Sequence, residues 1–149
     1  MNSRSPGRRT RPFAAALTLC LLPALAAPLA GAGPSPQQDG ATPTVREGVF
    51  SQAQAERGAS RFKEACASCH NIAELGGARF RNAWKDQSLG DLFDFLVNAM
   101  PQGDPGSLTP DEYTSLIAYI LSQSGYPAGS RELPSGKAPL SAYKLLPLP

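Results

Sequence analysis

Residues 66–70 read Cys-Ala-Ser-Cys-His, and this spacing of two thiols and one imidazole determines the chemistry available to the chain. Two thiols so spaced can reach the two vinyl groups of one porphyrin and become thioethers, while the adjacent imidazole ligates the iron. In an exported protein this run is the attachment signature of haem c. We therefore predict that Cys66 and Cys69 attach one haem covalently and that His70 binds its iron.

The front of the chain has the features of a secretory signal peptide. Four arginines come first, an apolar run covers residues 13–22, and Ala30-Gly31-Ala32 forms an A-x-A-like cleavage site. This order of basic, apolar and small residues is typical of an export signal. We predict that residues 1–32 are a signal peptide and that the mature protein is periplasmic.

Removal of the signal peptide changes the charge of the chain. The full sequence has 14 basic residues, four of them before position 32, and 12 acidic residues, all after it, so the formal charge changes from +2 to −2. A protein without excess positive charge lacks the phosphate contacts that nucleic-acid binding requires. An uncleaved membrane anchor is the alternative for the leader, but its prolines disfavour a spanning helix, and we expect no stable membrane insertion after cleavage.

Other uses of the cysteines are limited by the number of candidate ligands. Cleavage removes Cys20, which leaves Cys66, Cys69 and His70 as the mature chain's only cysteines and histidine. A structural zinc site needs four such ligands. A thioredoxin-like pair would need a βαβ context, and the sequence has no convincing strand. A disulfide between Cys66 and Cys69 remains the alternative to haem attachment.

Three segments begin with helix-capping signals. The signals are Ser51 with Gln54, Ser88 with Asp91, and Thr109-Pro110 with Glu112. A capping residue followed three positions later by Glu, Gln or Asp, or by proline at the first helical position, is typical of a helix start. We predict helices over residues 52–66, 89–99 and 110 to about 125, and therefore an all-α fold.

Residues from about 49 to 127 resemble a single-haem class I cytochrome c. In that family a glycine lies eight residues before the first haem cysteine and an aromatic residue four before it, which here are Gly58 and Phe62. The resemblance implies that the carboxy-terminal helix crosses at this glycine, with Leu116 and Tyr119 facing it. It also implies the cytochrome c fold, in which three main helices and long loops surround one covalent haem c.

Met100 is the only methionine after the leader, and Pro101 follows it directly. The resemblance implies that Met100 is the distal ligand of the haem iron, and a soft thioether in that position raises the reduction potential. A buried methionine is ordinarily a core filler. The alternatives are a lysine ligand, Lys63 or Lys85, or an open sixth iron site.

The segment from 71 to 87 must pass along one edge of the porphyrin. Leu75, Phe80 and Trp84 are suitable apolar walls. Arg79, Arg81 and the Trp84 indole N–H are candidates to bind the haem propionates, because a guanidinium matches a carboxylate with two parallel donors. Solvent-exposed arginines are an equally good interpretation of both positions.

A narrower resemblance concerns the function. Residues 51–70, 88–121 and 124–129 are similar to the small cytochromes associated with bacterial pyrroloquinoline-quinone (PQQ) dehydrogenases. This implies a non-enzymatic electron carrier, or the cytochrome subunit of a dehydrogenase complex, which takes electrons from the dehydrogenase and delivers them to a terminal oxidase. The alternative is a haem-based ligand sensor or a peroxidase-like enzyme with an open sixth iron site.

Two flanking segments have the composition of irregular chain. Residues 33–48 are predicted to be a linker, and residues 49–127 form the predicted haem domain. Residues 128–149 are rich in Pro, Ser, Gly and Leu, which predicts a mobile tail. The apolar residues near the end of the tail allow the alternative that it docks on the haem domain or on a partner.

Overall fold

The computed structural model describes residues 44–149, which fold around three longer helices. These are α1 (Gln52–Ala65), α4 (Leu89–Ala99) and α5 (Pro110–Gln123), and each agrees closely with a predicted helix. The shorter elements are η1 (Val45–Glu47), α2 (Ile72–Leu75), α3 (Gly77–Ala83) and α6 (Lys137–Leu140). Within residues 44–149 the only β-structure is isolated bridges, so the fold is all-α. The predicted signal peptide and most of the predicted linker lie outside the described residues.

Capping explains where the longer helices begin. In α4 and α5 the capping box is complete, with Ser88 paired to Asp91 and Thr109 paired to Glu112. At α1 the Ser51 side chain accepts from the backbone N–H of Gln54 at 3.0 Å, but the Gln54 side chain does not close the box. The expected capping box at α1 is therefore half formed, because the side chain of Gln54 is bonded elsewhere.

Helices α1 and α5 cross where Gly58 lies on α1. A Cβ atom at Gly58 would overlap the carbonyl oxygen of Ser115, so only glycine permits this approach. One turn later the rings of Phe62 and Tyr119 pack with centroids 5.6 Å apart. The crossing at Gly58 and its contact with Tyr119 confirm that part of the arrangement that the family resemblance implied, whereas the second residue nearest Gly58 is Ser115 and not Leu116.

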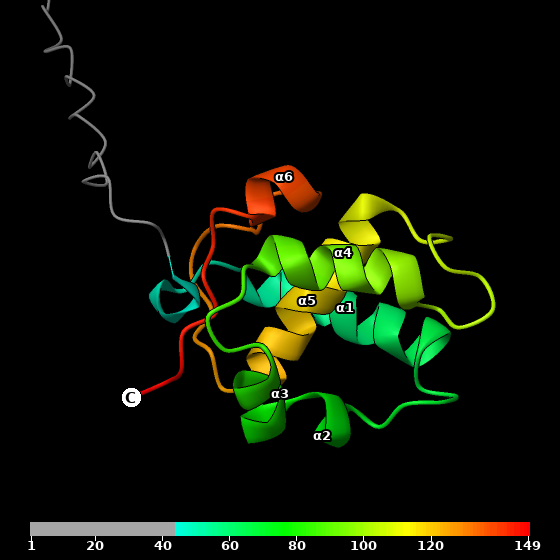
Figure 1. The fold of residues 1–149 in the computed structure, drawn as a ribbon, viewed down its shortest axis with the longest axis horizontal. Helices are drawn as coiled ribbons and strands as arrows, with labels where there is room; N and C mark the ends of the chain where they lie inside the picture. The colour runs from blue at the N-terminus through cyan, green and yellow to red at the C-terminus, as the bar shows by residue number, and fades with distance from the viewer. Residues whose placement is uncertain (1–43) are drawn as a thin grey trace, which may run out of the picture. The chain divides into compact units, whose positions relative to one another are not determined.

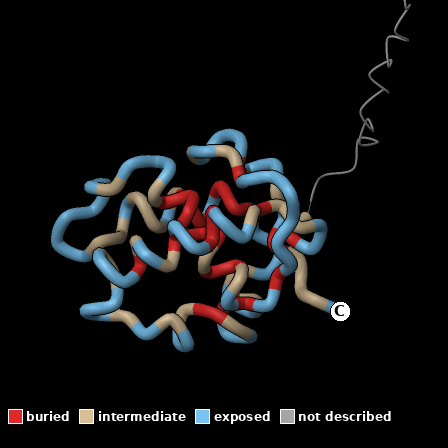
Figure 2. Tube along the Cα trace, turned by 180° about the vertical axis from the view of Figure 1, so that it is seen from behind, coloured by how far each residue is buried: buried red, intermediate tan, exposed pale blue. Residues whose placement is uncertain are grey.

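The remaining elements surround this crossed pair. In Figure 1, α4 lies on one side of α5, and α2 and α3 lie on the other side. Figure 2 shows that the buried stretches meet in the interior and that the loops are mostly exposed. The buried core is apolar and includes Phe50, Leu89, Ile117 and Leu121.

The tail is packed, which corrects the prediction of a mobile segment. Helix α6 packs on α4, and Leu133, Leu140 and Leu145 are buried. Backbone hydrogen bonds fix the tail at several points: Leu89 N–H donates to the Tyr143 carbonyl at 3.0 Å, and Leu145 N–H donates to the Gln87 carbonyl at 2.9 Å. Composition favoured disorder, but apolar burial and these long-range hydrogen bonds outweigh it.

The end of the predicted linker is also structured. Val45 in η1 is fully buried, and its N–H donates to the Lys144 carbonyl at 3.1 Å. The folded unit therefore begins earlier than position 49 and continues past position 127.

Candidate haem-binding site

One apolar cavity of about 290 Å³ opens beside the Cys-Ala-Ser-Cys-His run. Its lining comes from helices α1 to α5 and the loops between them. The lining residues are Phe62, Ala65, Cys66, Ser68, Cys69, His70, Leu75, Phe80, Trp84, Leu92, Phe95, Leu96, Met100, Pro101, Gln102, Leu108, Tyr113, Leu116 and Ile120. None of them is Asp, Glu, Lys or Arg, so the cavity is suited to a large apolar group.

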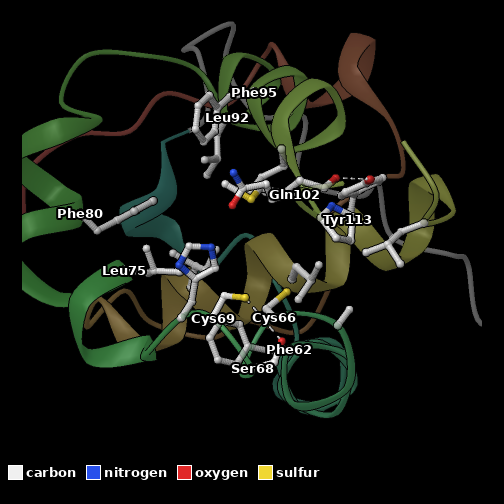
Figure 3. Close-up of a pocket in the computed structure, with 18 of the residues that line it drawn as sticks. Phe62, Cys66, Ser68, Cys69, Leu75, Phe80, Leu92, Phe95, Gln102 and Tyr113 are labelled. Atoms are coloured by element: carbon white, nitrogen blue, oxygen red, sulfur yellow. Dashed lines mark hydrogen bonds between the residues drawn. The ribbon is translucent and has the colours of Figure 1, made fainter. Parts of the chain in front are cut away.

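The end of α1 positions the two thiols. Cys66 N–H donates to the Phe62 carbonyl at 2.9 Å, and the N–H groups of Cys69 and His70 both donate to the Cys66 carbonyl, at 3.1 and 2.9 Å. The run therefore continues α1 as tight turns, which brings the Cys66 and Cys69 side chains to one side. Figure 3 shows both facing the cavity, with Gln102 and Leu92 across from them.

Both cysteines are free in the structure, so the alternative of a disulfide between them is not formed. Cys66 is half-buried and Cys69 is exposed. Burial raises the pKa of the Cys66 thiol, and the positive charge of Arg61 partly offsets this effect. The Ser68 hydroxyl donates to the Cys69 sulfur at 3.7 Å. Free thiols are the form from which thioether bonds are made.

Met100 lies at the carboxyl end of α4, where the backbone changes from helical to extended. Its side chain lines the same cavity as His70. Lys63 and Lys85, the alternative ligands, are exposed and do not line the cavity. Among the candidates for the distal ligand, the structure brings only Met100 to the cavity.

The predicted apolar walls are all present, since Leu75, Phe80 and Trp84 line the cavity. The sequence interpretation missed several other lining residues on α4 and α5. These are Leu92, Phe95, Leu96, Tyr113, Leu116 and Ile120, together with Leu108 in the preceding loop. Their spacing of three or four positions along each helix is the signal that could have identified them.

The two arginines predicted to bind the haem propionates do not line the cavity. Arg79 is exposed and is not part of the cavity lining. The Arg81 guanidinium donates to the Ser124 carbonyl just after α5. Because α3 is helical, Phe80 and Trp84 share the face toward the cavity, and Arg79 and Arg81 fall on other faces.

The donor set in the cavity fits haem c. Two free thiols, one imidazole and one thioether face a single apolar cavity. Soft sulfur and imidazole ligands are those that haem iron takes in c-type proteins. Among residues 44–149 no group of three or more Cys, His, Asp or Glu side chains is placed to hold a metal ion directly. The set of two thiols, one imidazole and one thioether suits an iron held by a porphyrin.

Residues 53–120, just under half of the chain, match the family model described as cytochrome c oxidase, cbb3-type, subunit III. The matched segment contains the Cys-Ala-Ser-Cys-His run and Met100 and extends from α1 into α5. Residues 53–120 form a c-type cytochrome domain. The domain has the all-α cytochrome c fold and carries covalently bound haem c with its iron. Neither a characterised protein nor a solved structure matches the chain.

The tail beyond the cytochrome domain is an addition to this match. Residues 128–149 lie outside the matched segment but belong to the same folded unit as the domain. No helix within residues 44–149 is long and apolar enough to span a bilayer.

Proposed function

We propose that the protein is an exported single-electron carrier in which the imidazole of His70 and the thioether of Met100 would hold the haem iron. The observation that carries this proposal is the position of both side chains on one apolar cavity, beside two free cysteines. A c-type cytochrome with this pair of ligands has no vacant iron position for substrate chemistry.

The chain's own residues have distinct roles in this proposal. Cys66 and Cys69 would attach the porphyrin, the imidazole of His70 would ligate its iron, and the thioether of Met100 would stabilise the ferrous form. The apolar side chains of α4 and α5 exclude water from the cavity. When bound, the haem supplies an iron that gains and loses one electron.

The partner surface is proposed to be the uncharged rim of the cavity. Cys69, Phe95 and Gln102 line the cavity and are also exposed, Phe95 to 49%. A rim without charged residues favours a small, short-lived contact that brings a partner's redox centre close to the haem. Rapid turnover of such contacts suits a carrier that alternates between donor and acceptor.

The donor and acceptor are proposed from similarity. Three segments resemble cytochromes associated with PQQ dehydrogenases, which supports a periplasmic quinoprotein dehydrogenase as donor. The signal-like leader supports the periplasmic location. The family model that matches residues 53–120 is named for an oxidase subunit, which supports a terminal oxidase as acceptor. The protein would act as a free carrier or as the cytochrome subunit of a dehydrogenase complex.

The ligand assignment is tested with the ferric holoprotein and the variant Met100→Ala. We expect the wild type to show the long-wavelength absorption band typical of thioether ligation and to bind cyanide slowly. The variant should keep its covalent haem, lose the band, show a lower reduction potential and bind cyanide rapidly.

Lys63→Ala and Lys85→Ala are the matched controls, because each removes an alternative ligand. Both should retain the band and the potential. A wild type that lacks the band and binds cyanide rapidly would contradict the carrier proposal and would favour a ligand sensor or a peroxidase-like enzyme.

A further inference from the structure

Tyr113 is a buried tyrosine whose hydroxyl bridges two points of the loop that follows Met100. It lies in the first turns of α5 and is 2% exposed. Its ring packs edge-on against Phe93 of α4, with centroids 6.0 Å apart and an angle of 73° between the planes. Because the ring is enclosed between two helices, the position of its hydroxyl is set by the packing of α4 against α5.

Both hydrogen-bonding capacities of this hydroxyl are used within the loop. It donates to the backbone carbonyl of Met100 at 2.7 Å and accepts from the backbone N–H of Gly106 at 3.0 Å. The two partners lie at opposite ends of the residue 100–106 segment. The hydroxyl therefore closes this segment into a loop that is fastened to α5.

The other backbone hydrogen bonds of this segment are local. Asp104 N–H donates to the Pro101 carbonyl at 3.0 Å, and Ser107 N–H donates to the Asp104 carbonyl at 3.3 Å. These bonds shape the turn but do not tie it to another element. Gly106 has a φ of +79°, a left-handed conformation that glycine adopts without strain.

The backbone of Met100 is consequently held on both sides. Its N–H donates to the Leu96 carbonyl at 2.9 Å, and its carbonyl accepts from Tyr113. With both groups fixed, the direction in which the side chain leaves the backbone is fixed as well. That direction brings the thioether to the cavity.

We propose that Tyr113 is a positioning residue, whose hydroxyl holds the Met100 loop in the geometry that presents the thioether to the haem iron. The inference rests on the proposed role of Met100 as the distal ligand. It adds a restraint supplied by α5, which lowers the frequency with which the loop moves away and exposes the iron. A buried hydroxyl with two partners is well suited to this task, because losing it leaves both partners unsatisfied.

The test compares Tyr113→Phe with a matched control, Tyr126→Phe. Tyr126 is also buried, at 4% exposed, and its hydroxyl donates to the Leu146 carbonyl in the tail at 3.0 Å. Each variant removes one buried hydroxyl and keeps the ring, but only Tyr113 contacts the Met100 loop. Haem staining of the denatured protein is used to check that both variants carry covalent haem.

The informative readout is the rate at which cyanide binds to the ferric holoprotein, because cyanide must wait for the methionine to leave. We expect Tyr113→Phe to bind cyanide about tenfold faster than wild type, which corresponds to about 1.4 kcal/mol. Its thioether absorption band should also disappear at a lower pH during an alkaline titration. Tyr126→Phe should lose a similar amount of unfolding free energy, with no change in the cyanide-binding rate or in the pH at which the band disappears.

Three results would overturn the proposal. Equal cyanide rates in wild type and Tyr113→Phe would show that the hydroxyl does not restrain the ligand. Equal acceleration of cyanide binding in both variants would show that the effect comes from a general loss of stability and not from the contact with the Met100 loop. Absence of the thioether band from the wild type would remove the ligand itself and, with it, the proposed function, so the two failures can be told apart.

A second measurement does not depend on the folding of any variant. The amide hydrogen of Gly106 should exchange more slowly with solvent than that of Gly103, for which the structure records no acceptor in the same loop. Exchange of Gly106 as fast as that of Gly103 would contradict the hydrogen bond on which the proposal depends.

Discussion

The side chain of Gln54 in α1 forms a pair of hydrogen bonds with the backbone of Leu133 in the tail. Its Nε2 donates to the Leu133 carbonyl at 3.0 Å, and its Oε1 accepts from the Leu133 N–H at 2.9 Å. Both residues are buried. A side-chain amide that reproduces the pairing of a β-ladder thus joins the tail to the first helix of the cytochrome domain.

Replacing Gln54 should remove this pair of hydrogen bonds between α1 and the tail. Gln54→Ala leaves the buried N–H and carbonyl of Leu133 without partners, so we expect it to lower the free energy of unfolding by about 1–3 kcal/mol. Urea denaturation of the holoprotein measures this loss. Gln52→Ala is the matched control, because Gln52 is exposed and its amide only reaches Glu56 in the same helix. Equal losses in the two variants would show that the tail contact contributes nothing specific.

The crossing of α1 and α5 depends on the absence of a side chain at residue 58. Gly58→Ala would gain about 1 kcal/mol in helix propensity. The new methyl group would overlap the Ser115 carbonyl, which belongs to backbone and cannot move aside. We expect a net destabilisation of about 1–3 kcal/mol, typical of overpacking. Ser60→Ala, on the exposed face of α1, is the control. If Gly58→Ala were as stable as this control, the two helices could move apart at Gly58 without a loss of stability.

The capping boxes predict how stability depends on pH. Hydrogen bonds from Ser88 hold the pKa of Asp91 below its ordinary value, and hydrogen bonds from Thr109 do the same for Glu112. A lowered folded-state pKa means that the carboxylate stabilises the fold above its unfolded-state pKa, and that this stability is lost as the pH falls through the folded-state pKa. Unfolding free energy should therefore decline below about pH 4. The double variant Asp91→Asn, Glu112→Gln should be less stable than wild type at neutral pH, and its unfolding free energy should decline less steeply as the pH falls. An unchanged slope would show that these two carboxylates do not cause the decline.

The uncharged rim predicts a weak dependence of electron transfer on salt. No Asp, Glu, Lys or Arg side chain lines the cavity, and after removal of the predicted leader the formal charge is only −2 before the haem propionates are added. The rate of reduction by the proposed donor, a quinoprotein dehydrogenase, should fall only slightly between low and physiological ionic strength. Stopped-flow reduction over a salt series measures this rate. A fall of about tenfold or more would show that charged patches beyond the rim direct the encounter.

The parts of the fold that sequence could predict are those specified by neighbouring residues. Ser88 and Thr109 cap their own helices, and the Cys-Ala-Ser-Cys-His run carries its chemistry within five positions. These signals are local, so the pattern is sufficient to interpret them.

The parts that could not be predicted depend on partners far away in the chain. The side chain of Gln54 bonds to Leu133 instead of completing its capping box, and Arg81 bonds to Ser124 instead of turning to the cavity. Competition between a local and a distant partner is decided by tertiary packing, which composition and spacing do not encode. The composition of the tail predicted irregular chain because the residues against which the tail packs are also far away in the sequence.

Covalent attachment of haem through Cys66 and Cys69 is the central claim, and haem staining after denaturing electrophoresis tests it most directly. Wild-type protein produced with a haem c maturation system should give one stained band, and Ser68→Ala, which keeps both thiols, should give the same band. The double variant Cys66→Ser, Cys69→Ser should give none, because no other cysteine remains after the predicted leader. A stained band of equal intensity in the double variant, or no band in the wild type, would contradict the account.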